Sequence, residues 1–321
     1  MTQSPPPAAD SAPLDAAIAA LQRGECIGLP TETVYGLAAD ALNRDAVRRI
    51  FALKGRPADH PVIVHLPDAG ALTRYAREVP PAALMLASRF WPGPLTLILK
   101  RHPDVPDEIT GGQDTVGIRV PAHPLAQALL QRFGRGLAAP SANRFGRISP
   151  TTAAHVRSEF GDQVPIVLDG GACAVGIEST IVDLSGGTPR VLRPGMISPA
   201  QIEAALAGLG TPVIGQHNAQ IRAPGLLEKH YAPRTPMQLI DRTALAEPSA
   251  HRCVLAVGEL PDGQMGLALP ADPAAYAQGL YAALRTLDES GASQILVELP
   301  PDQPAWQAIH DRLKRAAAGS R

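Results

Sequence analysis

The hydrophobic positions of roughly the first two thirds of the chain alternate between helical and strand-like spacing. Leu14, Ile18 and Leu21 recur at the three- and four-residue spacing of an amphipathic helix, and Gly24 follows to end it. Similar patterns predict further helices at 44–54, 80–90, 124–133 and 151–160. Short apolar runs predict buried strands at 26–29, 61–66, 94–100, 115–120, 137–139, 164–168 and 177–184. This order of elements predicts a large α/β domain over residues 11–210, built on a twisted mixed sheet.

The pattern changes after this domain. Residues 211–236 are polar, interrupted by proline and glycine, and without periodicity, which predicts a linker between two domains. A small Rossmann-like α/β domain with a parallel sheet is expected over 237–321, from the patterns at 237–240, 253–257, 273–288, 294–299 and 304–317. Residues 1–10, rich in proline and alanine, are expected to form a disordered tail.

Composition limits the classes of protein to which this chain can belong. The formal charge is only −1, which argues against a protein whose main task is to coat nucleic acid. Cys26, Cys173 and Cys253 are far apart and form no CxxC pair, as expected of buried thiols in a reducing compartment. The first residues lack the features of a signal peptide, and no apolar run approaches the roughly 20 residues of a membrane span. These features predict a cytoplasmic protein with no membrane attachment.

Polar side chains recur where the expected strands end, and in an open α/β sheet ligands bind at such ends. Lys54, Arg56 and Arg193 could neutralise phosphates, and Arg119 could bind a carboxylate. Hydroxyl and amide groups accompany them at Thr31, Thr33, Ser141, Asn143, Ser149 and Ser179. The sequence shows no convincing nucleophile–base pair, and no Walker A, GxGxxG or HExxH motif. Cations and hydroxyls without a nucleophile favour positioning and charge stabilisation of phosphoryl or nucleotidyl transfer.

These residues also have structural interpretations. Threonine, serine and asparagine close turns, and cations that follow a helix, such as Lys54 and Arg56, favour the helix dipole. His65 ends an expected strand, where an isolated histidine is more often a buried core residue than a ligand. Arg119 differs, because it alternates within an apolar strand and a charge that faces a core needs a partner. Taken singly, these residues do not decide between structure and function.

Taken in order, the motifs resemble those of a known family. The chain is similar to the long two-domain form of the L-threonylcarbamoyladenylate synthase family at PTETVYGL (30–37), KGR (54–56), TVGIRVPAHP (115–124), APSAN (139–143), GIESTIVD (176–183), RPG (193–195) and KHYAP (229–233). The resemblance implies that L-threonine, bicarbonate and ATP, with Mg²⁺, are converted to threonylcarbamoyl-AMP and pyrophosphate. The product would serve tRNA N6-threonylcarbamoyladenosine formation through downstream tRNA threonylcarbamoyltransferase proteins, with at most a weak contact to tRNA itself.

The resemblance also implies a role for the residue at each matching position. L-Threonine would be bound by Thr31, Thr33, Tyr35, His65, Arg119, the Ala139 backbone and Ser179. ATP would be bound by Lys54, Arg56, His60, Thr115, Ser141, Asn143, Ser149, Arg193, His230 and Tyr231. Lys54 and Arg56 would be the catalytic cations on the phosphates, and no side chain is implied as a metal ligand. The family commonly has asparagine at position 60, so the contact of His60 with ATP is open.

The implied mechanism has no covalent enzyme intermediate. The threonine amine forms a carbamate, and a carbamate oxygen attacks the α-phosphate of ATP. Because threonylcarbamate is labile in water, the pocket should close during the reaction, and the linker with His230 and Tyr231 would be the lid. Mg²⁺ bound through phosphates and water needs no carboxylate cage, which is consistent with the lack of a metal motif.

Two other functions fit parts of the sequence. A related carbamoyl-transferring enzyme of hydrogenase maturation shares the large domain, but such proteins carry CxxC pairs and an acylphosphatase domain, and this chain has neither. A non-catalytic double-stranded RNA-binding module would need a basic face, whereas acidic and basic residues nearly balance in both parts of the chain.

Overall fold

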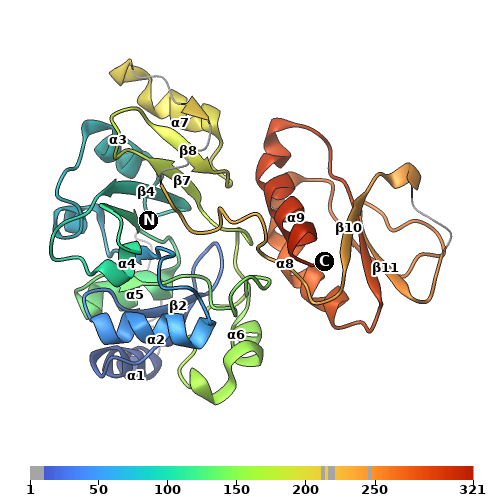
Figure 1. Ribbon diagram of the computed structural model, residues 1–321, viewed down its shortest axis with the longest axis horizontal. Coiled ribbons are helices and arrows are strands. Elements are labelled where there is room, and N and C mark those ends of the chain that lie inside the picture. Colours follow the sequence, from blue (N-terminus) through green and yellow to red (C-terminus); the bar gives the residue numbers. More distant parts are fainter. Residues whose placement is uncertain (1–10, 211–213, 216–220, 245–247, 321) are drawn as a thin grey trace, which may run out of the picture.

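Two α/β domains and an irregular connection between them make up the computed structural model, which describes residues 11–210, 214–215, 221–244 and 248–320 (Figure 1). The tail expected at 1–10 lies outside the described residues. The helices of the large domain are α1 (Ser11–Gln22), α2 (Arg44–Lys54), α3 (Pro81–Phe90), α4 (Asp107–Thr110), α5 (Pro124–Phe133), α6 (Ala153–Phe160) and α7 (Pro199–Leu206). Its strands are β1 (Ile27–Leu29), β2 (Gly36–Asp40), β3 (Ile63–His65), β4 (Leu95–Lys100), β5 (Thr115–Arg119), β6 (Leu137–Ala138), β7 (Thr180–Asp183), β8 (Arg190–Arg193) and β9 (Ile214–Gly215).

Within the described residues, the sheet of the large domain has nine strands in the order β1-β2-β6-β3-β5-β4-β7-β8-β9. The pairs β3–β5, β4–β7 and β8–β9 are parallel and the others are antiparallel, which confirms the expected mixed sheet. In the β3–β5 pair, His65 lies opposite Arg119. Because directly paired residues point to the same face, this register brings the two predicted threonine-binding residues together.

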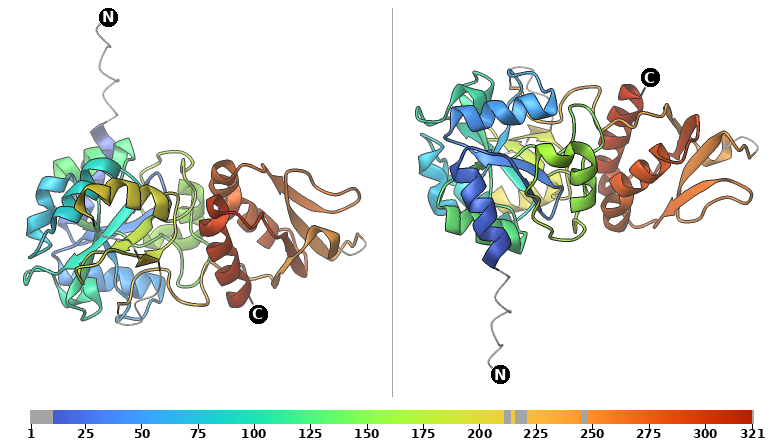
Figure 2. Two further views of the ribbon diagram at one scale, coloured as in Figure 1. Left: turned by 90° about the horizontal axis from the view of Figure 1, so that it is seen from above. Right: turned by 90° about the horizontal axis from the view of Figure 1, so that it is seen from below.

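Helices cover both faces of this sheet, as its alternation of side chains requires (Figure 2). In β2, Leu37 and Ala39 pack into the core beneath α2, α3, α6 and α7, whereas Ala38 between them packs into the core beneath α1 and α5. Each core is almost entirely aliphatic. Strands buried on both faces leave polar groups only at their ends, so the site can form only there.

The boundaries of α2 follow from local capping. Asn43 precedes the helix, and its Oδ1 accepts hydrogen bonds from the N–H groups of Asp45 and Ala46, each at 3.1 Å. Gly55 follows the helix in the left-handed region, at φ 62°, where a side chain would be strained. Lys54 is thus the last residue of α2 and Arg56 follows the turn, so both residues stand at the helix end, as the sequence predicts.

One expected strand does not form. Residues 164–168 make only a single bridge to β1, between Val167 and Gly28. Pro165 interrupts the run and has no N–H to donate, so the segment cannot extend the ladder. The strands β2 and β8 were not predicted, because GLAAD is poor in the β-branched residues on which strand prediction depends and RVLR is short and charged at both ends.

The small domain consists of a parallel sheet with two helices on one face. Its elements are β10 (Met237–Ile240), β11 (Arg252–Val257), β12 (Gly266–Leu269), α8 (Pro273–Asp288), β13 (Gln294–Glu298) and α9 (Gln307–Gly319). The strand order is β10-β13-β11-β12, and all three pairs are parallel, as predicted. Figures 1 and 2 show α8 and α9 between this sheet and the large domain. The two helices therefore bring side chains of the small domain to the boundary between the domains.

The described part of the connection, residues 221–236, forms no helix or strand, in keeping with the irregular pattern of its sequence. The preceding strand β9 still pairs with β8, so the large sheet continues into the range expected as linker. Arg222 N donates to Gln113 Oε1 at 2.7 Å, and Ala232 N donates to Gly146 O at 2.9 Å. The segment thus lies against the large domain at both ends. Among the described residues, no helix combines the length and the apolar character that crossing a membrane requires.

Candidate active site

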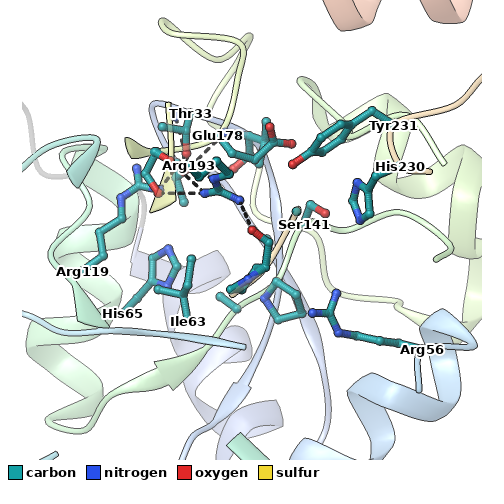
Figure 3. A pocket seen from close by; sticks show the side chains of 18 residues that line it. Thr33, Arg56, Ile63, His65, Arg119, Ser141, Glu178, Arg193, His230 and Tyr231 are labelled. Atoms are coloured by element: carbon teal, nitrogen blue, oxygen red, sulfur yellow. Dashed lines mark hydrogen bonds between the residues drawn. The ribbon is translucent and has the colours of Figure 1, made fainter. Parts of the chain in front are cut away.

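A pocket lies where the loop after β1, the ends of β3, β5, β6 and β8, and the 221–236 segment meet (Figure 3). Of the residues predicted for the site, those that line it are Thr31, Thr33, Arg56, His65, Arg119, Ala139, Ser141, Ser179, Arg193, His230 and Tyr231. Figure 3 shows Arg119 and His65 on one side of the pocket, Tyr231 and His230 on the opposite side, and Arg193 between them. The tertiary structure therefore brings most of the predicted residues to one place.

Arg119 is a buried cation at the end of β5 and already has several partners. Its Nη1 donates to Thr33 Oγ1 at 2.8 Å and its Nε to Gly93 O at 3.1 Å. Its Nη2 lies 2.6 Å from Glu32 Oε1. Glu32 is therefore the partner that a buried Arg119 needs, and the sequence did not identify it. The guanidinium is thereby held in one orientation in the pocket wall, where it can present its charge to a carboxylate.

Thr31 both closes a turn and lines the pocket. Its hydroxyl accepts the N–H groups of Thr33 and Val34, at 3.2 and 3.3 Å, and donates to the carbonyl of Val34 at 2.6 Å, which closes a tight turn. It also lies 2.8 Å from the hydroxyl of Thr33. The turn places both threonines in the pocket wall next to Arg119.

Arg193, at the end of β8, fastens the 221–236 segment to the sheet. Its Nε and Nη2 donate to the carbonyl of Ser179 at 3.0 and 2.9 Å, and Nη2 also reaches Ser179 Oγ at 3.1 Å. Its Nη1 donates to Pro224 O at 2.9 Å. Burial lowers the pKa of Arg193, but a guanidinium starts so far above neutrality that it stays charged.

Arg56 lines the pocket, whereas its neighbour His60 does not. Arg56 Nη2 donates to Pro61 O at 2.8 Å, and its guanidinium lies 5.7 Å from the ring of Phe145. Burial lowers the pKa of Arg56 to about 10, so it remains cationic at neutral pH. The ring of His60 also packs against Phe145, with the ring centroids 5.5 Å apart. Its Nδ1 lies 3.1 Å from Asp59 Oδ1.

Lys54 is buried and does not line the pocket. Its Nζ donates to the carbonyl of Ser141 at 2.6 Å and to the carbonyl of Asn143. Burial first, and then the charge of Arg56, lowers the pKa of Lys54. In this arrangement Lys54 holds the 141–143 loop, of which Ser141 faces the pocket.

The other predicted residues surround the pocket without lining it. Tyr35 donates its hydroxyl to Gly171 O at 2.8 Å within the core. Asn143 Nδ2 donates to Arg147 O at 2.9 Å, and Ser149 donates to the carboxylate of Glu178. Thr115 begins β5, so four residues, or about 13 Å of strand, separate it from Arg119.

Two histidines of the pocket are electrically neutral. Burial lowers the pKa of His65 and of His230 to about 3 each, with nearby arginines adding to the effect. The Nδ1 atom of each is buried and has no hydrogen-bond partner among the described residues. Neutral rings with an unpaired nitrogen can accept or donate a hydrogen bond to a ligand without adding charge.

Tyr231 has an unusual backbone conformation. Its φ of 62° is left-handed, and it is the one non-glycine residue in the described ranges with positive φ. Its hydroxyl is buried, lines the pocket and has no partner among the described residues, and its ring stacks on Tyr281 at 5.7 Å. Non-glycine residues in this region cost about 1–3 kcal/mol and occur often at ligand sites.

Several residues of the site were not predicted: Glu32, Phe145, Glu178, Tyr281 and Arg312. For Arg312 a signal existed in the sequence. Helix 304–317 places Ile309, Leu313 and Ala316 on its apolar face, and Arg312 lies on that same face. A charge at such a position indicates a buried partner.

Fold and site together define a class: a two-domain α/β protein with a pocket at the sheet ends, whose buried guanidiniums and hydroxyls suit an anionic small molecule. A family model described as "Telomere recombination" matches residues 19–195, and one described as "Threonylcarbamoyl-AMP synthase, C-terminal domain" matches residues 197–318. The chain belongs to the threonylcarbamoyl-AMP synthase family, in its long two-domain form.

Relatives and solved structures match both domains. The threonylcarbamoyl-AMP synthase of Pyrococcus abyssi is 38% identical over 311 residues, which cover 92% of each chain. That of Bacillus subtilis is 38% identical, with 94% of this chain and 92% of the relative covered. The crystal structure of P. abyssi Sua5 complexed with L-threonine matches with a TM-score of 0.86 and 35% identity, over 96% of this chain and 94% of that chain.

Proposed function

We propose that this protein is an L-threonylcarbamoyladenylate synthase, which converts L-threonine, bicarbonate and ATP to threonylcarbamoyl-AMP and pyrophosphate for tRNA N6-threonylcarbamoyladenosine formation. One observation carries the proposal. The likeness to threonylcarbamoyl-AMP synthases extends over both domains, and most of the residues predicted for the site line one pocket, formed by the large domain and the 221–236 segment. L-Threonine as the substrate is supported by its presence in the similar P. abyssi structure.

The reaction proceeds by two bond-forming steps. The threonine amine bonds to the carbon delivered by bicarbonate, with loss of water, and gives a carbamate. A carbamate oxygen then bonds to the α-phosphorus of ATP, and the bond to the β-phosphate oxygen breaks to release pyrophosphate. Neither step needs an enzyme nucleophile, so the task of the protein is positioning, charge stabilisation and exclusion of water.

Each task has residues suited to it. Arg119, held by Glu32 and Thr33, binds the threonine carboxylate on one side of the pocket. Arg56 and Arg193 line the same pocket and oppose the negative charge of the ATP phosphates in this proposal. The 221–236 segment forms part of the pocket wall and limits the access of water to the carbamate.

Mg²⁺ accompanies ATP in this proposal. Among the described residues, no group of three or more His, Cys, Asp or Glu side chains could hold a metal ion. The carboxylate in the pocket wall, Glu178, accepts hydrogen bonds from neighbouring side chains. These residues fit an ion bound through phosphates and water, which supplies additional charge neutralisation when present.

The site favours this enzyme over an RNA-binding module. Arg56, Arg119 and Arg193 are all buried and face an interior pocket, whereas double-stranded RNA needs cations on an outer surface. We propose that the product passes to downstream tRNA threonylcarbamoyltransferase proteins, with at most weak contact to tRNA. Cytoplasmic location fits the supply of ATP and the three free, buried cysteines.

A direct assay tests the proposal. The purified protein is incubated with Mg²⁺, ATP, bicarbonate and isotopically labelled threonine, and the products are separated and identified by mass. Threonylcarbamoyl-AMP should form, with threonine-dependent release of pyrophosphate. Controls omit one substrate at a time. Lack of the adduct in the complete mixture would refute the proposal, and tight binding of double-stranded RNA in parallel would support the alternative.

A further inference from the structure

One buried carboxylate connects the small domain to the pocket. Glu178 lines the pocket beside Ser179. Its Oε1 accepts a hydrogen bond from Ser149 Oγ at 2.6 Å. Its Oε2 accepts hydrogen bonds from Tyr281 Oη at 2.9 Å and Arg312 Nε at 2.8 Å. Because Tyr281 and Arg312 lie on α8 and α9, the small domain supplies two of these donors.

Arg312 reaches three parts of the site from outside it. The side chain is fully buried, and its Nη2 donates to the backbone carbonyls of Glu178 and Pro194, at 3.3 and 3.1 Å. Its guanidinium lies 5.3 Å from the ring of Tyr231. Its Nη1 donates to Asp311 at 2.6 Å, on the same helix. Arg312 itself does not line the pocket.

The charge of Glu178 matters for a site that binds polyphosphate. Burial by itself would raise the pKa of Glu178, but the charges of Arg312 and Arg193 outweigh it and lower this pKa to about 2. Glu178 is therefore ionised, and its negative charge would repel phosphates unless a cation neutralised it. Arg312 can neutralise Glu178 without lining the pocket itself, so the charge of Arg193 stays available to a ligand in the pocket.

Tyr231 also depends on the small domain. Its left-handed backbone is strained, so its surroundings must hold it in place. Its ring stacks on Tyr281 at 5.7 Å and lies 5.3 Å from the guanidinium of Arg312. Gly225 packs so closely that a Cβ there would lie 2.1 Å from Tyr231 Oη. The hydroxyl of Tyr231 is thereby directed at the pocket (Figure 3).

We propose that Arg312 is a positioning residue of the active site, which neutralises Glu178 and supports Tyr231 so that Arg56 and Arg193 can bind the ATP phosphates. The inference rests on the proposed function, and it assigns the small domain a part in ATP binding. Arg312 acts through Glu178 and Tyr231, and makes no contact with substrate.

The test measures the Kd of ATP with Mg²⁺ by calorimetry, and the melting temperature, on the full chain. Arg312→Met leaves Glu178 without its ion-pair partner, whereas Glu178→Gln combined with Arg312→Met removes both charges of the pair. Arg242→Met is the control, because the half-exposed Arg242 forms an ion pair with the buried Glu298, at 3.1 Å, inside the small domain and away from the pocket.

We expect Arg312→Met to weaken ATP binding about tenfold or more, since it strands a buried charge beside the phosphates. The double variant should recover part of this affinity, because it removes the stranded charge of Glu178 but still lacks the contact of Arg312 with Tyr231. Arg242→Met should bind ATP like the wild type. A purely structural role predicts the opposite pattern: a lower melting temperature for Arg312→Met with unchanged ATP affinity.

Unchanged affinity in Arg312→Met, or a double variant as weak as Arg312→Met, would overturn the inference. Should Arg312→Met fail to fold, the double variant still decides, because it buries no unpaired carboxylate: ATP binding weakened by less than about tenfold supports the inference, and lost binding refutes it. Failure of the proposed function is distinguishable, because the wild type itself would then form no threonylcarbamoyl-AMP.

Discussion

At the scale of single residues, the buried cations differ in what they contact. Arg119 and Arg56 face the pocket, whereas Lys54 is directed at two backbone carbonyls behind it. The sequence separates Arg119, which alternates within an apolar strand, from Lys54 and Arg56 at a helix end, but it does not separate these last two from each other. Their surroundings separate them, so substitutions at the three positions should fail in different ways.

Arg119 should discriminate between the two substrates. Arg119→Met removes the cation proposed for the threonine carboxylate and should weaken threonine binding by on the order of 2–4 kcal/mol, with a much smaller effect on ATP. Calorimetry with each ligand measures both losses. Arg77→Met is the control, because the ion pair of Arg77 with Asp114 lies on the exterior. Equal losses for threonine and ATP would remove Arg119 from this role.

A second variant, at Glu32, shows which group causes the loss of threonine binding in Arg119→Met. Without Arg119, the Glu32 carboxylate loses its ion-pair partner, and its charge alone could repel threonine. The double variant Glu32→Gln with Arg119→Met removes that charge. Threonine binding should stay weak in the double variant, because the lost guanidinium, and not the stray carboxylate, is the cause. Recovery of binding would assign the effect to Glu32.

Lys54 and Arg56 should separate stability from activity. Arg56→Ala should reduce adenylate formation by about 10²-fold with little change in melting temperature, since Arg56 opposes charge in the pocket. Lys54→Ala should also reduce activity by about 10²-fold, but it strands two buried carbonyls at about 1–3 kcal/mol each, so melting should fall too. Pyrophosphate release and melting temperature are measured on the same preparations. Near-normal activity in both variants would favour the helix-end interpretation.

At the scale of elements, the 221–236 segment is the most informative, because it has no secondary structure yet contributes to the pocket wall. Its polar, proline-rich sequence contains little that could form a core of its own. His230 and Tyr231 are nevertheless buried, through contacts with the large domain and with α8 and α9. Contacts with the two domains are what order this segment. Its order should therefore change when a ligand fills the pocket.

Limited digestion with trypsin tests that response. Arg222, Lys229 and Arg234 are exposed within the segment and provide cleavage sites. Cleavage there should be slowed when ATP and threonine bind together, because ligands add contacts to His230 and Tyr231 from inside the pocket. Digestion with threonine alone is the comparison. Equal cleavage rates with and without both ligands would show that the segment is a tether and not a lid.

At the scale of the whole molecule, the two domains differ in how independent their cores are. The large domain has two aliphatic cores of its own, above and below its sheet. The core of the small domain, in contrast, includes Val34, Ile148 and Ile177 from the large domain. The boundary between the domains is therefore partly apolar, and side chains of the large domain complete the core of the small domain.

Truncation after residue 210 should leave a folded large domain with little activity. The sheet up to β8 and both aliphatic cores remain, so cooperative thermal unfolding is expected, at a lower melting temperature than that of the full chain. Product yield should fall sharply, because the truncated chain lacks the segment that covers the pocket and the partners of Glu178. Full activity in the truncated chain would contradict this expectation.

The sequence by itself determined the elements and most of the pocket wall. Helical and strand periodicity act over a few residues, so they located elements such as α2 and β5, and failed where a proline, an alanine-rich run or a short charged strand broke the pattern, as at 164–168, β2 and β8. The order of the motifs placed Arg119, Arg193 and Tyr231 at one site, and the structure brings them together there.

Only the tertiary structure decided which side chains form pairs. Glu32 and Arg119 meet across the sheet ends, and Glu178 and Arg312 meet across the domain boundary although 134 residues separate them. Periodicity records which face of an element is buried, but not what lies opposite that face. A buried charge must have a partner, and the partner's identity depends on the packing of elements far apart in the chain. For that reason the sequence indicated a pocket for ATP and threonine, while the part of the small domain in it emerged from the fold.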